Sequence, residues 1–220
     1  MQIEAVIFDF DGVIVDTEPL HYKAFQEILS PKGLGYSWED YVSVYMGFDD
    51  RDAFNEAYRR KGAHLSKKEL EELICQKADV FQKVISDGVA PYPGVLELIR
   101  NLEARNIPIA ICSGALRSDI EPIIANLGIS ESFTHIVTAD DVPHSKPDPT
   151  CYIMAYQKLA ESFPDKISKP ENCMAIEDTP AGIAAAKGAG LKVVAVTNSY
   201  PDNELGKADT IVTQLDLLLS

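Results

Sequence analysis

From Pro91 onward the sequence alternates between short apolar runs and amphipathic segments, and this alternation restricts the fold more than any other feature. The strand-like runs are Ile107–Cys112, His135–Thr138, Cys173–Ile176, Lys192–Val196 and a short Thr210–Thr213. Helical spacing falls between them, first in Val95, Leu98, Ile99 and Leu102, and next in Leu116, Ile120, Ile123, Ile124 and Leu127. Pro122 fits the second of these helices if Asp119 is its N-cap. Such alternation predicts an α/β fold with a parallel sheet covered on both faces.

Residues 18–87 differ, because they show helical patterns and no convincing strand. Ser66-Lys67-Lys68-Glu69 is a capping box, and apolar residues follow it on one helical face. Ser37 resembles another helix start. We therefore predict a core domain of residues 1–17 and 88–220, with a helical domain of residues 18–87 inserted after the first strand. Two adjacent connections join the inserted domain to the core. They are Thr17–Pro19 and the Pro- and Gly-rich segment Gly88–Gly94, and this arrangement favours a hinge.

The first strand-like run, AVIFDFDGVIVDT (residues 5–17), carries two carboxylates in its apolar middle. Side chains at i and i+2 of a strand point the same way, so Asp9 and Asp11 would oppose each other's ionisation. Either a positive group lies between them, or they lie in solvent. Asp11-Gly12 between apolar runs is also typical of a hairpin turn, and the segment alone does not decide between these interpretations.

Polar residues follow three further strand-like runs. Ser113-Gly114 follow Ile107–Cys112, Lys146 lies in the loop after His135–Thr138, and Glu177-Asp178 follow Cys173–Ile176. Each has a purely structural interpretation: Ser113 as a turn or cap, Lys146 as a solvated loop residue, and the acidic pair as charge at a helix N-terminus. In an open parallel sheet, however, ligands bind beyond the carboxyl ends of the strands, where all these residues would meet.

Together these residue types suit one chemistry. Asp9, Asp11, Glu177 and Asp178 would form an oxygen-rich cluster that Mg²⁺ neutralises well. Lys146 and Ser113 would supply a positive charge and a hydroxyl to phosphoryl oxygens. One carboxylate can attack phosphorus, and a second can protonate the leaving oxygen and later deprotonate water.

Composition narrows the class of protein. The chain has 220 residues and a formal net charge of −14, which opposes general affinity for nucleic acid or an anionic membrane. No apolar run reaches the ~20 residues of a membrane span, and the N-terminus lacks signal-peptide features, so we expect a cytoplasmic protein. We expect it to be a monomer or a weak dimer. The scattered cysteines, without any CxxC spacing, are expected to be mostly reduced and buried: Cys75, Cys112, Cys151 and Cys173.

Four motifs now carry a resemblance over nearly the whole chain: FDFDGVIVDT, ICSGA, SKPDP and IEDTPAGIAAAKGAG. The sequence resembles the haloacid dehalogenase superfamily, in its phosphatase and β-phosphoglucomutase-like branch with an inserted helical cap. The resemblance implies a Rossmann-like core in which Asp9 is the nucleophile and Asp11 is the general acid/base. It implies that Mg²⁺ is bound by Asp9, by the backbone carbonyl of Asp11, and by Glu177 and Asp178, while Ser113, Gly114 and Lys146 bind the phosphoryl group. It also implies that Thr17 and His21 lie near the cap hinge and that Arg51 is a cap arginine that reaches the substrate.

We therefore expect a Mg²⁺-dependent phosphatase that hydrolyses a small phosphorylated metabolite, similar to phosphoglycolate or a sugar phosphate, through an aspartyl-phosphate. The alternative is a β-phosphoglucomutase-like isomerase. Arg51 is surrounded by Asp49, Asp50 and Asp52, which would weaken a site for a second phosphate and favours the phosphatase. The presence of Asp11, the second aspartate of the pair, argues against a dehalogenase activity. A phospho-accepting signalling receiver is the non-enzyme alternative, but receivers are smaller, lack an inserted cap and carry the phosphoacceptor on a middle strand.

Overall fold

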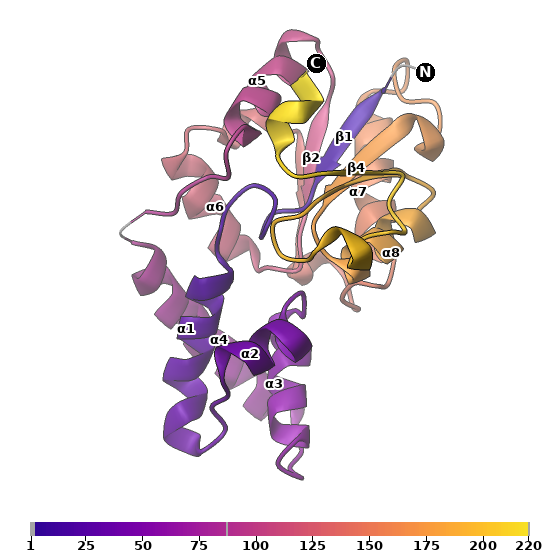
Figure 1. Cartoon of the computed structure of the whole chain (residues 1–220). Helices are drawn as coiled ribbons and strands as arrows, with labels where there is room; N and C mark the ends of the chain where they lie inside the picture. Colours follow the sequence, from indigo (N-terminus) through magenta and orange to yellow (C-terminus); the bar gives the residue numbers. More distant parts are fainter. Residues whose placement is uncertain (1–2, 87, 220) are drawn as a thin grey trace. The chain divides into compact units, whose positions relative to one another are not determined.

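The computed structural model describes residues 3–86 and 88–219. The chain divides into two compact units (Figure 1). The larger unit contains Met1–Asp16 and Ala90–Ser220, and the smaller unit contains Thr17–Val89. The chain thus leaves the larger unit after its first strand and returns to it some seventy residues later.

The larger unit is built on a six-stranded sheet whose order is β3-β2-β1-β4-β5-β6. All neighbouring strands are parallel. The strands are β1 (Ala5–Phe8), β2 (Ile109–Cys112), β3 (His135–Val137), β4 (Cys173–Glu177), β5 (Lys192–Val196) and β6 (Thr210–Val212). Strand β1 lies in the middle, where Val6 pairs with Ile109 of β2 and with Met174 of β4. The predicted α/β fold with a parallel sheet is confirmed.

Helices cover the sheet because its central strands are apolar on both faces. Helix α7 (Thr150–Ser162) packs on β1, β2 and β3, and helix α8 (Pro180–Gly188) packs beside it on β4 and β5. Helix α5 (Val95–Ala104) packs against the C-terminal turn Leu215–Leu219, as Figure 1 shows. No helix among the described residues is both long and apolar enough to cross a membrane.

Helix α6 (Arg117–Asn126) begins earlier than predicted. Its N-cap is Leu116, which has no side chain able to cap, and Asp119 lies within the first turn. The expectation that Asp119 is the N-cap is therefore wrong. Pro122 lies beyond the first turn, where it removes one backbone donor from the helix. Packing of the buried Ile120, Ile123 and Ile124 offsets this loss.

Among its described residues, the smaller unit consists of helices joined by turns and loops, without a strand. Its α-helices are α1 (Glu18–Leu29), α2 (Trp38–Asp40), which continues as a π-helix over Tyr41–Tyr45, α3 (Asp50–Arg59) and α4 (Lys67–Ile85). The capping box at Ser66 is confirmed: its hydroxyl accepts a hydrogen bond from the Glu69 amide, and Glu69 accepts one from the Ser66 amide. Ser37 is the N-cap of α2, and its hydroxyl accepts a hydrogen bond from the Asp40 amide.

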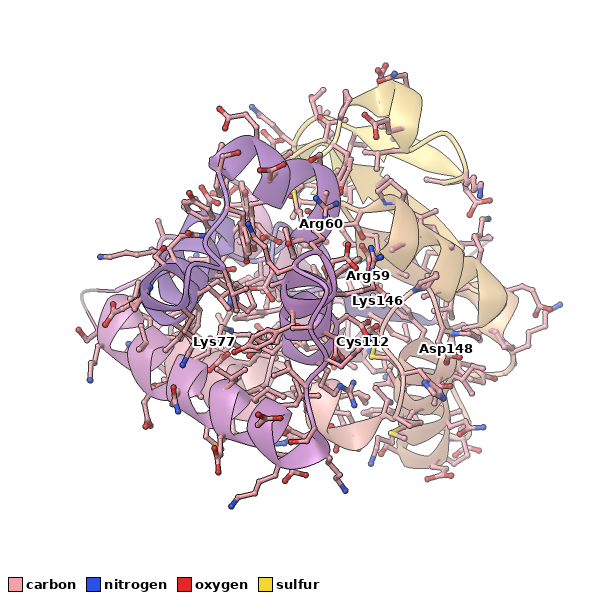
Figure 2. The ribbon with its side chains drawn as sticks, turned by 90° about the horizontal axis from the view of Figure 1, so that it is seen from below. Arg59, Arg60, Lys77, Cys112, Lys146 and Asp148 are labelled. Carbon is pink, nitrogen blue, oxygen red and sulfur yellow. A yellow bond between two sulfur atoms is a disulfide. The ribbon has the colours of Figure 1, made fainter. Side chains whose placement is uncertain are left out.

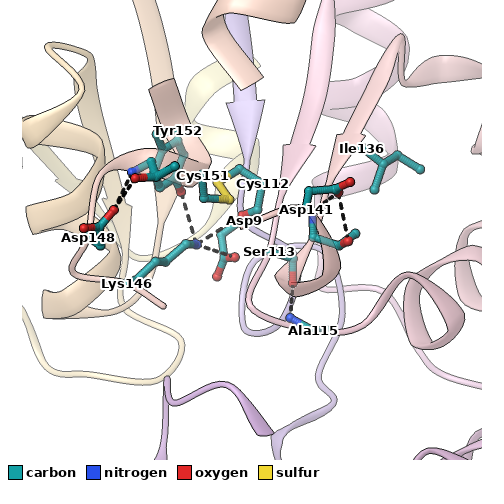
Figure 3. Close-up of a disulfide and its surroundings, with 12 residues drawn as sticks. Asp9, Cys112, Ser113, Ala115, Ile136, Asp141, Lys146, Asp148, Cys151 and Tyr152 are labelled. Atoms are coloured by element: carbon teal, nitrogen blue, oxygen red, sulfur yellow. Dashed lines mark hydrogen bonds and ion pairs between the residues drawn. A yellow bond between two sulfur atoms is a disulfide. The ribbon is translucent and has the colours of Figure 1, made fainter. Parts of the chain in front are cut away.

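A disulfide joins Cys112, the last residue of β2, to Cys151 in the first turn of α7 (Figure 3). The expectation of reduced cysteines is therefore wrong for this pair. The two residues are 39 positions apart in sequence, and their Cα atoms lie 6.1 Å apart because α7 packs directly on β2. Cys75, which is exposed, and Cys173, which is buried, are free thiols.

We expect reduction of this disulfide to lower the free energy of unfolding of the protein by about 4 kcal/mol. The chain-entropy model gives this value for a closed loop of about forty residues, because the cross-link restricts the unfolded chain. Urea unfolding with and without dithiothreitol measures the difference. The double variant Cys112→Ala, Cys151→Ala is the control and should respond equally in both conditions; an oxidised wild-type midpoint that reductant leaves unchanged would contradict the prediction.

Candidate active site

Asp9 and Lys146 form the buried ion pair at the centre of the site (Figure 3). Asp9 directly follows β1, and its backbone amide donates to the Ile176 carbonyl of β4 at 2.9 Å, which fixes its position between two strands. The Lys146 Nζ donates to Asp9 Oδ1 at 2.8 Å. Burial and the nearby charge of Glu177 raise the pKa of Asp9, while Lys146 acts in the opposite direction. Burial and Glu177 together outweigh the lysine, so the pKa of Asp9 lies above its ordinary value, and a further positive charge near Asp9 would favour its ionised form.

Lys146 is held from several sides. Besides Asp9, its ammonium donates to Glu177 Oε1 at 2.7 Å and to the Cys112 carbonyl at 3.1 Å. Its side chain is almost completely buried. Burial alone would lower the pKa of Lys146, but the charges of Asp9 and Glu177 outweigh it and raise the pKa above its ordinary value. Lys146 is thus a permanent cation whose position is set by β1, β2 and β4.

Glu177 ends β4 and has no exposed surface. Its Oε1 accepts hydrogen bonds from Lys146 and from the Tyr152 hydroxyl, and its Oε2 accepts from the amide and hydroxyl of Thr179. Thr179 is the N-cap of α8, and its hydroxyl accepts a hydrogen bond from the Gly182 amide at 3.0 Å. A Cβ on Gly182 would lie only 1.9 Å from Glu177 Oε1, so glycine is required for α8 to approach this carboxylate.

Asp178 is also fully buried, and its Oδ2 accepts a hydrogen bond from the Ser199 hydroxyl. The segment after Asp11 packs directly on it. Gly12 adopts φ 78°, and a Cβ there would lie 1.9 Å from Asp178 Oδ2, so both the backbone conformation and the contact need glycine. The Asn198 side-chain amide donates to the Gly12 carbonyl at 2.7 Å and holds this segment in place.

These carboxylates fit a divalent cation. One oxygen each from Asp9, Glu177 and Asp178 lie within 4.8 Å of one another, and all three residues are buried. The Lys146 ammonium pairs with two of them, Asp9 and Glu177. The group therefore holds more negative charge than its lysine neutralises, and carboxylate oxygens are the donors that Mg²⁺ and similar hard cations prefer.

Ser113 and Gly114 follow β2 at the same edge of the sheet. Ser113 is buried, and its amide donates to the Val137 carbonyl of β3 at 2.9 Å. Its hydroxyl accepts from the Ala115 amide at 2.9 Å and lies 3.5 Å from Asp11 Oδ2. The structure thus brings together all the core residues that the sequence placed at strand ends: Asp9, Asp11, Ser113, Gly114, Lys146, Glu177 and Asp178.

In the helical unit, Thr17 and His21 lie at the start of α1. Thr17 is buried, and its carbonyl accepts from the His21 amide. His21 lies against the Phe81 ring, with centroids 4.1 Å apart, and its Nδ1 is 2.9 Å from Lys77 Nζ. Lys77, labelled in Figure 2, also forms a 2.9 Å ion pair with Asp50. His21 therefore belongs to a buried charged network inside this unit.

Arg51 lies in the first turn of α3. Its Nε donates to Asp49 Oδ2 at 2.8 Å. Asp49 is the N-cap of α3 and also accepts from the Asp52 amide. Burial raises the pKa of Asp49, and the hydrogen bond from Arg51 opposes that shift. Arg51 thus helps to neutralise a buried cap carboxylate.

Sequence reasoning missed several polar residues around these sites. Asn198 and Ser199 follow β5, so the rule that selected the other strand ends could have found them. Lys77 lies on the buried face of α4 between Leu73 and Phe81, and a charged residue in that apolar pattern was the available signal. For Tyr152 the pattern gave no signal, because a tyrosine on a buried helical face is normal core composition.

Comparison with known proteins identifies the family. The family model described as haloacid dehalogenase-like hydrolase matches residues 6–196. Protein CbbY of Rhodobacter capsulatus is 31% identical over 206 residues, covering 91% of this chain and 88% of that protein. The fructose-1-phosphate phosphatase YqaB of Escherichia coli (strain K12) is 29% identical over 191 residues, covering 87% of this chain and 95% of that protein.

Solved structures agree with the sequence matches. A crystal structure of β-phosphoglucomutase from Clostridium difficile matches with a TM-score of 0.87 and 27% identity, covering 99% of this chain and 93% of that one. The family indicated by the four sequence motifs is confirmed: the chain belongs to the haloacid dehalogenase-like hydrolases.

Proposed function

We propose that this protein is a Mg²⁺-dependent phosphatase that hydrolyses a small phosphorylated metabolite through an aspartyl-phosphate on Asp9. The observation that carries this proposal is the 2.8 Å contact between Lys146 Nζ and Asp9 Oδ1 at the end of β1. A cation held at a buried carboxylate favours the ionised, nucleophilic form and lies where phosphoryl charge would arrive. Family membership and the phosphatase among the relatives support the same reaction.

In the first step, a carboxylate oxygen of Asp9 attacks phosphorus, and the bond from phosphorus to the substrate oxygen breaks. Asp11 donates its proton to that leaving oxygen, so the product leaves as a neutral alcohol. Lys146 and the Ser113 hydroxyl bind phosphoryl oxygens, with the backbone at Gly114 beside them. The 3.5 Å separation of Ser113 Oγ and Asp11 Oδ2 supports a shared position at the phosphoryl group.

In the second step, Asp11, now ionised, removes a proton from water, and the resulting hydroxide attacks phosphorus. The bond between phosphorus and the Asp9 oxygen breaks, which releases inorganic phosphate and restores the Asp9 carboxylate and the protonated Asp11. Asp9, Asp178 and the Asp11 carbonyl would hold Mg²⁺, with the charge of Glu177 beside them. The bound ion supplies positive charge to the phosphoryl group and offsets the excess of carboxylates.

We further propose that the Thr17–Val89 unit acts as a cap, with a hinge at Thr17 and His21 and at residues 88–94. Arg51 would reach the substrate from the cap. Its pairing with Asp49 reduces the charge that it can offer to a second phosphate, which favours a monophosphate of the phosphoglycolate or sugar-phosphate type. Arg117 does not supply a second positive charge for such a phosphate, because its guanidinium donates to Asp141 and to the Ile136 carbonyl. The mutase among the matching structures keeps an isomerase as the alternative.

Replacement of the nucleophile is the first test. We expect Asp9→Asn to reduce phosphate release from a panel of phosphorylated metabolites to background, and we expect excess EDTA to do the same to the wild type. Circular dichroism should show that the variant is folded. The exposed Asp165→Asn is the matched control and should retain wild-type turnover. Near-wild-type activity of Asp9→Asn, or full activity in EDTA, would overturn the proposal.

The second test separates the acid from the nucleophile. Asp11→Asn should reduce kcat by ~10²–10⁴ for alkyl phosphates, the usual contribution of a general acid/base. The reduction should be smaller for aryl phosphates, whose leaving groups need less protonation. Steady-state rates on a matched pair of substrates measure this ratio. Equal reductions for both classes would mean that Asp11 acts structurally.

The third test distinguishes phosphatase from mutase. The protein, Mg²⁺ and β-glucose 1-phosphate are incubated with a catalytic amount of glucose 1,6-bisphosphate. We expect release of inorganic phosphate from the best panel substrate to exceed formation of glucose 6-phosphate, because a single phosphate site suffices for hydrolysis. Faster formation of glucose 6-phosphate than release of phosphate from any substrate would establish the isomerase instead.

A further inference from the structure

We propose that Tyr152 is a positioning residue that fixes the Glu177 carboxylate and, through it, the phosphate-binding ammonium of Lys146. The inference rests on the proposed function, in which Lys146 binds the phosphoryl group. It assigns a task to the hydroxyl of a side chain that would otherwise be an ordinary member of the core.

The contacts of Tyr152 single out its hydroxyl. The residue has no exposed surface, and it lies on α7 among apolar neighbours. Its hydroxyl nevertheless donates to Glu177 Oε1 at 2.8 Å and lies 3.5 Å from Lys146 Nζ. The same ammonium lies 4.9 Å from the centroid of the tyrosine ring. Tyr152 therefore contacts both members of the Lys146–Glu177 ion pair.

The shared oxygen explains how the hydroxyl acts on Lys146. Glu177 Oε1 accepts from both Lys146 and Tyr152, so the two donors divide the charge of one carboxylate oxygen. Without the hydroxyl, that charge would act on Lys146 alone and draw the ammonium toward Glu177, away from Asp9 and the phosphoryl group. A tyrosine hydroxyl, whose ordinary pKa is about 10, remains a donor at neutral pH.

The fold holds Tyr152 firmly enough for this task. Its neighbour Cys151 is joined by the disulfide to Cys112, and the Cys112 carbonyl accepts a hydrogen bond from Lys146 (Figure 3). Helix α7 and strand β2 therefore cannot separate without moving Lys146. The hydroxyl, the disulfide and the lysine form one connected support beside Asp9.

Tyr152→Phe tests the proposal, because it keeps the buried ring and removes only the hydroxyl. We expect the competitive Ki of inorganic phosphate and the substrate KM to rise about tenfold, the effect of losing one hydrogen bond to a charged group. kcat should change less than threefold, since Asp9 and Asp11 remain. Tyr156→Phe, one turn later on α7, is the matched control and should leave Ki, KM and kcat unchanged.

Calorimetric binding of inorganic phosphate keeps this inference separate from the proposed function. If the wild type binds phosphate but releases none from any substrate, the proposed function fails, while weaker binding by Tyr152→Phe still supports the positioning of Lys146. A variant with a lower melting temperature but wild-type Ki and phosphate affinity would show that Tyr152 only packs the core. A wild type that binds no phosphate would also overturn the inference.

Discussion

The buried ammonium of Lys146 is the interaction on which the rest of the site depends. Two buried carboxylates, Asp9 and Glu177, lie at the ends of the adjacent strands β1 and β4, and both pair with this ammonium. Burying such charges is costly unless they are paired and hydrogen-bonded, and removing one partner leaves the other uncompensated. Lys146 meets that requirement for both acids at once. The contacts of Lys146 with Asp9, Cys112 and Glu177 thereby fix the loop that carries it to the central strands.

The other half of the acidic group depends on backbone packing. The Oδ2 atom of Asp178 accepts a hydrogen bond from the Ser199 hydroxyl, and the backbone of Gly12 packs against the same oxygen. Asn198 holds the Gly12 carbonyl, so the loop after β5 fixes the segment that follows Asp11. One side of the site is therefore held by a charge, and the other side by a loop and a glycine. This division leaves the centre of the group with an excess of negative charge that a cation would balance.

The features that could be predicted from the sequence are those that follow from hydrophobic periodicity or from the residues at the ends of strands. The parallel sheet, the capping box at Ser66 and the family were correct because each depends on local pattern or on residues next to a strand terminus. Contacts between distant elements were not predictable in this way. The Cys112–Cys151 disulfide requires knowing that α7 packs on β2, and the contact of Tyr152 with Glu177 requires the same packing. The start of α6 was missed because tertiary packing overrode the local capping preference of Asp119.

The two glycines that touch acidic side chains limit how the sequence of this protein can vary. Any side chain at Gly12 would occupy the space of the Asp178 carboxylate, and any side chain at Gly182 would occupy that of Glu177. A change at Gly182 is therefore tolerable only together with a shorter or displaced acid at position 177, whereas at Gly12 the positive φ is a second constraint that a shorter acid at position 178 would not remove. Positions 182 and 177 should behave as a linked pair during divergence. A relative that has lost the acid at position 177 would no longer need glycine at position 182, and such a double loss would mark a member of the family that has abandoned this chemistry.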